Sequence, residues 1–486
     1  MTSQKLDRRW IAMALLAVAQ FVVVLDASIV NVALPSIGRG LHLSQNSLSW
    51  VVNGYVLTFG GFLLLGGRAA DLIGRRIMFI VGLAIFALAS FAGGLAHSEG
   101  TLIAARAVQG FGAALLSPAA LSLVTTIFTE GAQRNKALGI WGAVAGSGGA
   151  AGVLLGGVLT SGLGWRAVLF VNTPIGIAAA LAAPALLPEA RGDGATRGFD
   201  AAGAVTVTGG LSAIVYALVE APSAGWGSLQ TIGLLALGAV LLAAFAVIET
   251  RSQAPLVPPR IFRVASVAGA NVTGLLIGAS LFSMFFFISL YMQQVLGYGA
   301  LKAGVSYLPL AGVIVLAAGG ASQLVNRLGF KPVLMSGLAL IAVALVWFAQ
   351  VPTNGSYAAD LLGPMLVAAA GLGLAFVPVT IAAMTGVREH EAGLASGLIN
   401  TAQQVGGALG LAVLATIANS RTTSEMKAAH GAPSALHHAL TLGFHSAFLT
   451  GAGLALLGLV LAAVLIRTRR TESEPAGAAV AVESAA

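Results

Sequence analysis

One carboxylate and one guanidinium interrupt long apolar segments of the chain. Asp26 lies in the apolar segment 11–34, and Arg106 lies in the apolar segment 101–123. Two helices that cross a membrane in opposite directions would place Asp26 about 22 Å from the first edge and Arg106 about 8 Å from the opposite edge. In a hydrocarbon core of about 30 Å these depths coincide. The two side chains can therefore meet if the two helices are neighbours.

Such a pair suits reversible binding of a proton. Removal from water disfavours the charged carboxylate, whereas a nearby guanidinium favours it. A movement that changes their spacing or their access to water would then change whether Asp26 holds a proton. We predict that Asp26 is the proton-binding group and that Arg106 adjusts its affinity, because ionisable residues inside membrane helices are usually functional. The alternative is a static ion pair that fixes helix packing.

The composition requires a membrane around these residues. Of 486 residues, 57% are hydrophobic and 9% are charged, whereas soluble proteins carry about 25% charged residues. Apolar segments of roughly twenty residues recur along the chain, without the ten-residue alternation that is typical of membrane barrels. Backbone groups in lipid must bond to one another, which favours helices. The sequence therefore predicts an all-α polytopic membrane protein.

Fourteen spans are expected, in a 6+2+6 arrangement. They lie near 11–34, 48–66, 77–96, 101–123, 138–160, 167–187, 202–219, 229–248, 264–291, 303–322, 333–351, 357–384, 394–418 and 444–466. The predicted units are an N-terminal six-helix half (1–187), a linker with two extra helices (188–263), a C-terminal six-helix half (264–466) and a disordered cytoplasmic tail (467–486).

The basic residues predict the orientation. With the N-terminus inside, nineteen Lys and Arg residues fall on the cytoplasmic side, five fall outside and one lies within a span. This asymmetry is typical of multi-pass proteins of the cell membrane, here with both termini cytoplasmic. The net charge of +8 is therefore a signal of topology, and the expected partner is the lipid bilayer and not nucleic acid.

An internal repeat supports two related halves. The segment 67–76 resembles the segment 322–331. The matched positions are Asp71 with Asn326, Gly74 with Gly329, and Arg76 with Lys331. Repeated halves with a site between them are a recurring plan of transporters.

Several motifs in order resemble one known family. Segment 67–76 matches the loop signature G-x-x-x-D-x-x-G-R-[KR], and further motifs occupy 25–35, 106–110, 164–176 and 396–410. Over about residues 10–470 the chain resembles the major facilitator superfamily, in its fourteen-helix branch of drug:proton antiporters. The resemblance implies the major facilitator fold and export by alternating access.

The fifth predicted span departs from the antiporter motif of that branch. The motif is usually G-x-x-x-G-P-x-x-G-G, and here Val153 replaces the proline while Gly148, Gly152, Gly156 and Gly157 are kept. The glycines predict a helix-packing face, whereas the residue that would kink the helix is absent. In the C-terminal half, Gln403 stands where related chains often have arginine, so one expected charge contact is missing.

The loop after the second span has a different predicted role. Gly67 and Gly74 permit a tight passage between helices, and Asp71 lies near the start of the third helix, where its charge is favourable. Arg75 and Arg76 can hold acidic or carbonyl partners across the inner face. We interpret these five residues as a conformational latch, with a plain topology anchor as the alternative.

Polar and aromatic residues on the apolar spans are candidates for substrate contact. An apolar cavity with few polar groups suits small amphiphilic molecules, although interhelical hydrogen bonding explains each residue singly as well. The candidates are Asn31, Asn53, Tyr55, Gln109, Phe285, Tyr291, Gln293, Gln294, Asn400 and Gln404.

The sequence offers no motif for an enzyme. The phosphate-binding motif G-x-x-x-x-G-K-[ST], H-E-x-x-H and G-x-S-x-G do not occur, and cysteine is absent. Four histidines between 430 and 445 suit a solvated loop better than a metal site, so neither a metal nor a cofactor is expected. The prediction is a monomeric, proton-coupled exporter of amphiphilic drugs or antibiotics. The alternatives are a proton-linked or facilitative carrier for one metabolite and a membrane sensor that does not transport.

Overall fold

The computed structural model is helical throughout the part of the chain that it describes. That part comprises residues 2–128, 131–189, 200–252, 255–387 and 392–466. Thirteen helical segments within it are long and apolar enough to cross a membrane. A fourteenth is α5 (Gly131–Leu163), whose described apolar portion is Ala151–Leu163. The all-α membrane architecture is confirmed, and the predicted tail lies outside the described residues.

The first six spans use seven helices. They are α1 (Thr2–Leu41), α2 (Gln45–Ile73), α3 (Arg75–Gly94), α4 (Glu99–Ile127), α5, and the pair α6 (Ala167–Phe170) and α7 (Asn172–Leu186), which together form the sixth span. Serine side chains begin two of them: Ser44 accepts a hydrogen bond from the Ser47 N–H, and Ser98 forms a capping box with Thr101. These caps satisfy backbone N–H groups in the first turns of α2 and α4.

The linker and the second half are also built of helices. Their elements are α8 (Ala201–Ala224), α9 (Leu229–Arg251), η1 (Pro259–Arg263), α10 (Ala265–Leu290), η2 (Tyr291–Val295), α11 (Ala300–Ser306), α12 (Leu308–Leu328), α13 (Phe330–Phe348), η3 (Tyr357–Leu361), α14 (Leu362–Met384), α15 (Ala392–Ala428), η5 (Pro433–Ala435) and α16 (Leu436–Leu465). Helix α15 ends ten residues later than predicted from the apolar pattern. An Arg421–Glu425 pair, one turn apart, supports the polar extension.

The two halves repeat one another in their closest helix crossings. A Cβ added to Gly82 on α3 would lie 2.8 Å from the Gly112 carbonyl oxygen on α4. The same addition at Gly337 on α13 would lie 2.7 Å from the Gly371 carbonyl oxygen on α14. Only glycine permits such backbone contact. The internal repeat seen in the loops therefore extends to the packing of the helices.

A second pair of crossings also repeats. On α5, a Cβ at Gly152 would lie 2.7 Å from the Leu25 carbonyl oxygen of α1. On α15, Gly406 meets the Leu275 carbonyl oxygen of α10 in the same way. Leu25 and Leu275 are therefore corresponding positions of the two halves.

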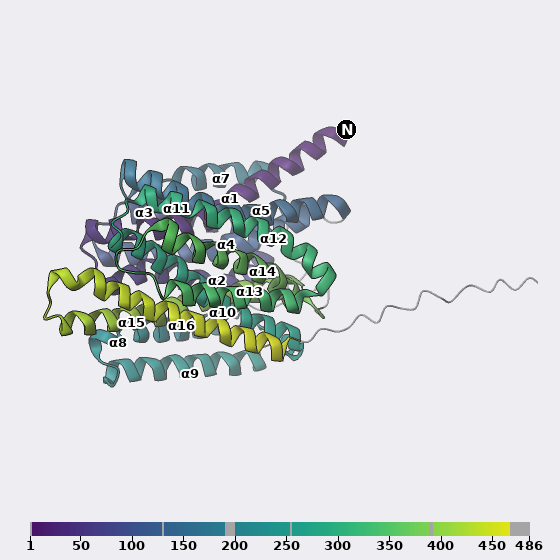
Figure 1. Ribbon diagram of the computed structural model, residues 1–486. Coiled ribbons are helices and arrows are strands. Elements are labelled where there is room, and N and C mark those ends of the chain that lie inside the picture. The colour runs from purple at the N-terminus through teal and green to yellow at the C-terminus, as the bar shows by residue number, and fades with distance from the viewer. Residues whose placement is uncertain (1, 129–130, 190–199, 253–254, 388–391, 467–486) are drawn as a thin grey trace, which may run out of the picture.

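The linker helices lie across the seam between the halves. Helix α8 contacts α2 of the first half and α15 of the second, and α9 packs on α8. The Thr416 hydroxyl donates to the Leu218 carbonyl at 2.6 Å, and Trp50 contacts Tyr216 with ring centroids 5.8 Å apart. Figure 1 shows α8 and α9 along one side of the bundle.

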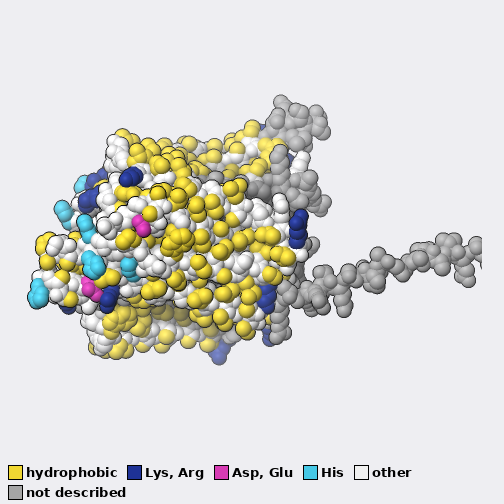
Figure 2. All heavy atoms as spheres, in the orientation of Figure 1, with side chains coloured by type: hydrophobic (Ala, Val, Ile, Leu, Met, Phe, Trp, Pro, Cys, Tyr) yellow, Lys and Arg dark blue, Asp and Glu magenta, His cyan; other side chains and the backbone are white. Residues whose placement is uncertain are grey.

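The start of α1 and the end of α16 lie at one end of the bundle. Helix α1 begins and α16 ends at the same side of Figure 1, which we name the terminal face. In Figure 2 hydrophobic side chains cover the middle of the visible surface, and charged and histidine side chains gather toward the two ends. This distribution fits a protein that spans a membrane many times.

Candidate functional site

The centre of the candidate site is a fully buried ion pair. Arg106 on α4 donates from Nη1 to Asp26 Oδ2 on α1 at 2.6 Å. Asp26 is 0% and Arg106 2% exposed. Asp26 and Arg106, which the sequence placed at the same depth in the membrane, are therefore in contact in the structure.

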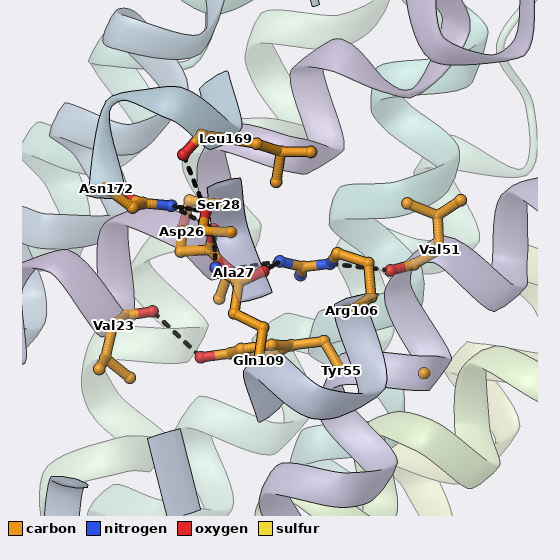
Figure 3. A network of polar contacts seen from close by, with 12 residues as sticks. Val23, Asp26, Ala27, Ser28, Val51, Tyr55, Arg106, Gln109, Leu169 and Asn172 are labelled. Atoms are coloured by element: carbon orange, nitrogen blue, oxygen red, sulfur yellow. Dashed lines mark hydrogen bonds and ion pairs between the residues drawn. The ribbon is translucent and has the colours of Figure 1, made fainter. Parts of the chain in front are cut away.

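Two amides complete the coordination of the carboxylate. Gln109 Nε2 donates to Asp26 Oδ1 at 2.9 Å, and Asn172 Nδ2 on α7 donates to the same oxygen at 2.7 Å. Asn172 Nδ2 also donates to Ser90 Oγ at 3.1 Å, and the Ser90 hydroxyl donates to the Leu169 carbonyl at 2.8 Å. Figure 3 shows the side chains of Arg106, Gln109 and Asn172 turned toward Asp26. The negative charge of Asp26 is thus held by three N–H donors.

The guanidinium has its own set of partners. Arg106 Nη1 also donates to Gln109 Oε1 at 2.6 Å, and Arg106 Nε donates to the Val51 carbonyl on α2 at 3.2 Å. Its carbon Cζ lies 4.4 Å from the centre of the Tyr55 ring, a cation–π contact. The Tyr55 hydroxyl points to the Val23 carbonyl of α1 (Figure 3). The network therefore ties α1, α2, α4 and α7 together.

These contacts decide what the site can do chemically. Each of the three side chains that bond to the Asp26 carboxylate donates through an N–H group, so both carboxylate oxygens act as acceptors. A proton on Asp26 needs an acceptor, and Gln109 can supply one by turning its amide so that Oε1 faces Asp26. That turn takes Oε1 away from Arg106. The Asn172 amide offers a second acceptor, because its Oδ1 is buried and has no hydrogen-bond partner among the described residues.

The sequence argument missed two members of this network. Asn172 and Ser90 were not among the predicted site residues, although both are 0% exposed and bond to each other. The available signal was the position of Asn172 in the motif at 164–176, at the start of α7. Two of the predicted substrate contacts, Tyr55 and Gln109, lie in the network around the ion pair.

The predicted latch residues bind within the first half. Arg75 Nη1 donates to Thr126 Oγ1 at 2.6 Å, joining α3 to α4. Arg76 pairs with Glu189 and donates to the Leu187 carbonyl at 3.3 Å, at the end of α7. In the second copy, Lys331 Nζ donates to the Ala463 carbonyl at 2.7 Å, at the end of α16.

The glycines of the latch lie on either side of an aspartate that the sequence placed in a loop. Helix α2 extends to Ile73, so Gly67 and Asp71 belong to its last turns and not to a loop. The side chain of Asp71 lies outside the described residues. Gly74 has φ 128°, a backbone conformation that favours glycine. The chain reverses there between α2 and α3.

The four glycines of α5 serve two different partners. Gly148, Gly152 and Gly156 face α1, and a Cβ at Gly156 would lie 2.9 Å from the Ile29 carbonyl oxygen. Gly157 instead faces the second half, where its Cβ would lie 2.8 Å from the Ala300 carbonyl oxygen. The packing face predicted from these residues therefore includes a contact between the halves.

Two predicted substrate residues, Asn31 and Gln293, lie where the two halves contact each other, at the end of α1 that is away from the terminal face. Gln293 Nε2 donates to the Val32 carbonyl at 2.9 Å. Ser289 Oγ donates to the Asn31 carbonyl at 2.9 Å, while Asn31 Nδ2 donates to its own helix. Helix α1 begins at the terminal face, so these residues lie toward its other end. The halves are thus hydrogen-bonded to each other there.

The remaining candidates divide by exposure. Tyr291 is buried and donates to the Pro352 carbonyl, and Phe285 stacks on Tyr307 with centroids 5.5 Å apart. Gln294 and Gln404 are half-buried, and Asn400 is exposed. Asn53 is 0% exposed, and both polar atoms of its amide lack a hydrogen-bond partner.

A metal site is not indicated. No group of three or more side chains able to hold a metal ion occurs among the residues that the structure describes. The buried acids among the described residues are Asp26, Asp200 and Glu249, and both oxygens of Asp26 are occupied by N–H donors.

The comparison with protein families decides the identity of the fold. The model of the Major Facilitator Superfamily matches residues 16–411. The chain belongs to this superfamily. Superfamily members are transporters and not enzymes, and the many membrane helices make this one a multi-pass protein of the cell membrane.

Several curated relatives are named for antibiotics. The puromycin resistance protein of Streptomyces alboniger is 42% identical over 97% of this chain and 94% of its own. The cephamycin export protein of Amycolatopsis lactamdurans is 44% identical, over 85% of each chain. The tetracenomycin C resistance and export protein of Streptomyces glaucescens is 35% identical, over 96% and 93%. This transporter therefore lies among antibiotic export and resistance proteins.

Solved structures agree with the fold. A bacterial homologue of the human lysosomal transporter Spinster, in an inward-facing and occupied conformation, superposes with a TM-score of 0.69 at 16% identity, covering 95% of this chain and 97% of that one. The nucleoside transporter NupG superposes with a TM-score of 0.62 at 13% identity, covering 94% and 100%. At these identities the likeness shows the major facilitator fold alone.

Proposed function

We propose that this transporter exports small amphiphilic antibiotics or drugs by antiport with protons, through alternating access of its two halves. The observation that carries the proposal is the buried Asp26 carboxylate, which is paired to Arg106 at 2.6 Å with no access to bulk water. A static scaffold has no need of an ionisable pair in lipid, where each charge is costly. The names of the antibiotic relatives support the class of substrate.

The network suggests how a proton would be linked to movement. Asp26 on α1 and Arg106 on α4 are joined only through side chains, and a small shift between these helices lengthens their contact. A weakened contact leaves the carboxylate partly unpaired in a dry place, where the neutral form is favoured. Gln109 then turns its amide oxygen to accept the new O–H. Proton uptake and separation of the pair become one event.

The contacts between the halves supply the moving part. Ser289 on α10 and Gln293 on η2 bond to the outer portion of α1, the helix that carries Asp26. Gly157 packs α5 against α11. Opening of the halves at this end breaks those bonds and pulls directly on α1. The pull reaches the carboxylate because Asp26 and Asn31 belong to the same helix, little more than one turn apart.

The alternatives are separated by substrate range. A carrier for one metabolite would protect cells from no antibiotic, and a sensor would move nothing. We expect cells that express the transporter to resist several unrelated amphiphilic compounds in a panel of dyes, quaternary amines and antibiotics. Orientation with both termini in the cytoplasm, action as a monomer and independence of nucleic acid belong to the same proposal.

The decisive experiment is the Asp26→Asn variant in inverted membrane vesicles with an imposed pH gradient. Asparagine keeps the size of the side chain but cannot gain or lose a proton. We expect gradient-driven uptake of a transported dye to be lost, while binding of the dye persists. The matched control is Glu425→Gln, which removes one carboxylate from a half-exposed pair with Arg421. Full gradient-driven transport by Asp26→Asn would remove this residue from the mechanism.

A further inference from the structure

A second pair of buried carboxylates lies away from the ion-pair network, where the linker hairpin begins and ends. Asp200 precedes α8, and Glu249 lies in the last turn of α9. They are 7% and 4% exposed. Each has one oxygen in use: Asp200 Oδ1 caps α8 by accepting from the Gly203 N–H at 2.8 Å, and Glu249 Oε2 accepts from the Val257 N–H at 2.9 Å.

The other oxygens of the two groups have no hydrogen-bond partner among the residues that the structure describes. Asp200 Oδ2 and Glu249 Oε1 are buried and accept no hydrogen bond. The two carboxyl groups are also close together. A Cβ added to Gly203 would lie 2.9 Å from Glu249 Oε1 and 3.0 Å from Asp200 Oδ1, so these oxygens are within about 6 Å of each other. Glycine at this position leaves room for both acids.

Within the described part of the chain, no cation forms an ion pair with either carboxylate. The described cations on neighbouring elements are Arg251 on α9, Arg68 on α2, and Arg260 and Arg263 on η1; those on α9 and η1 are exposed. No ion pair between described residues includes Asp200 or Glu249. Two like charges this close in a buried place are strongly unfavourable, and such pairs hold one proton between them.

The number of free carboxyl oxygens decides what the pair can bind. A calcium ion takes about six to eight oxygens, and magnesium also needs a nearly complete octahedron. Among the described residues the pair leaves only two free carboxyl oxygens, Asp200 Oδ2 and Glu249 Oε1, which are too few for either ion but enough to hold one hydrogen. We propose that Asp200 and Glu249 bind a single proton between them, and that this proton fastens the base of the linker hairpin to the seam between the halves.

The position of the pair explains why its proton matters. Val257, which donates to Glu249, packs in a small apolar cluster with Leu65 of α2, Val267 of α10 and Leu398 of α15. This cluster joins the linker to both halves. Loss of the proton leaves two carboxylates that repel each other, and the resulting separation loosens Val257 in the cluster. The linker would thus respond to pH on the terminal face.

The test is the melting temperature of the purified full-length protein in lipid nanodiscs, between about pH 5 and about pH 9. The folded state holds the shared proton more tightly than the unfolded state, so its stabilisation is present at low pH and is lost as the pH rises. We expect Glu249→Gln, a neutral side chain that can donate to Asp200, to remove this loss. Relative to the variant, the natural protein should lose about 2 °C or more over the range.

Controls make the outcome decisive. Asp200→Asn, which keeps a good helix cap, should flatten the same pH dependence, and Glu425→Gln should leave it unchanged. Parallel pH curves for the natural protein and Glu249→Gln would overturn the proposal. A melting temperature that depends on added Mg²⁺ in the natural protein but not in Glu249→Gln would also overturn it, in favour of a metal ion. The readout does not use transport, so its failure is distinct from failure of the proposed antiport.

Discussion

Replacing Asp26 by asparagine leaves the Arg106 guanidinium buried without its counter-charge. Arg106 is 2% exposed and cannot become neutral by releasing a proton. Breaking one side of a buried ion pair typically costs about 3–5 kcal/mol. The remaining partners of Arg106 are neutral: Gln109 Oε1, the Val51 carbonyl and the Tyr55 ring. We therefore expect Asp26→Asn to lower the free energy of unfolding by about 3–5 kcal/mol.

The reverse replacement is expected to be milder. In Arg106→Gln the carboxylate of Asp26 can take up a proton, become neutral and avoid a buried charge. The cost then approaches that of an unsatisfied polar group, about 1–3 kcal/mol. Because the folded variant binds a proton that the unfolded chain releases, its stability should rise as the pH falls. The double variant Asp26→Asn with Arg106→Gln has no buried charge, so it should be more stable than Asp26→Asn alone.

The assay is equilibrium unfolding of the four proteins in lipid nanodiscs at two pH values, combined as a double-mutant cycle. The control Glu425→Gln removes a partner of the exposed Arg421 and should cost about 0–1 kcal/mol. If Asp26→Asn costs no more than Arg106→Gln, or if the two losses simply add, the buried pair does not couple the residues energetically. Either result would refute the reasoning from burial and charge.

Three further predictions follow from single contacts. Asn172→Ala removes one donor to Asp26, so it should cost about 1–3 kcal/mol in unfolding and shift the pH profile of transport; an unchanged profile would separate Asn172 from the coupling. Gly406→Ala puts a methyl group against the α10 backbone and should cost about 1–3 kcal/mol, whereas Gly319→Ala, with open space around it, should be nearly neutral in the same unfolding assay. Gln293→Leu deletes a hydrogen bond between the halves and should raise labelling of cysteines introduced at that end of the seam; unchanged labelling would count against a gate there.

Much of the architecture could be predicted because lipid restricts what a chain can do. A segment of about twenty apolar residues must be a helix that crosses the membrane. The rise per residue of a helix then converts sequence position into depth, which placed Asp26 opposite Arg106. The repeat of Gly74 and Arg76 as Gly329 and Lys331 indicated two related halves. The crossings of α3 with α4 and of α13 with α14 confirm it.

The direction of polar side chains could not be predicted in the same way. Depth fixes how far along a helix a residue lies, but its neighbours around the helix depend on how all the helices pack. Gln109 and Tyr55 were therefore assigned to substrate, although they face Arg106. Asn172 was not predicted as a site residue. It is the first residue of α7, and asparagine is common at helix starts and in turns, so its type alone does not indicate a contact with Asp26. Some predicted spans also end before the observed helices do, because hydropathy does not indicate the helical turns that extend beyond the apolar segment.

The repeat also shows that the charged site belongs to one half only. In the second half the position of Asp26 is taken by Leu276, next to the matched carbonyl of Leu275, and the position of Arg106 by Met365, six residues before the matched Gly371. Leu276 and Met365 are 7% and 0% exposed, so they pack as ordinary core residues. The backbone crossings are thus kept in both halves, whereas the ionisable groups are confined to the first. Movement of the second half can reach the ion pair through the hydrogen bonds to α1 and through the packing of α15 on α2, the helix that holds Val51 and Tyr55 against Arg106, so both contacts are mechanical links of the proposed cycle.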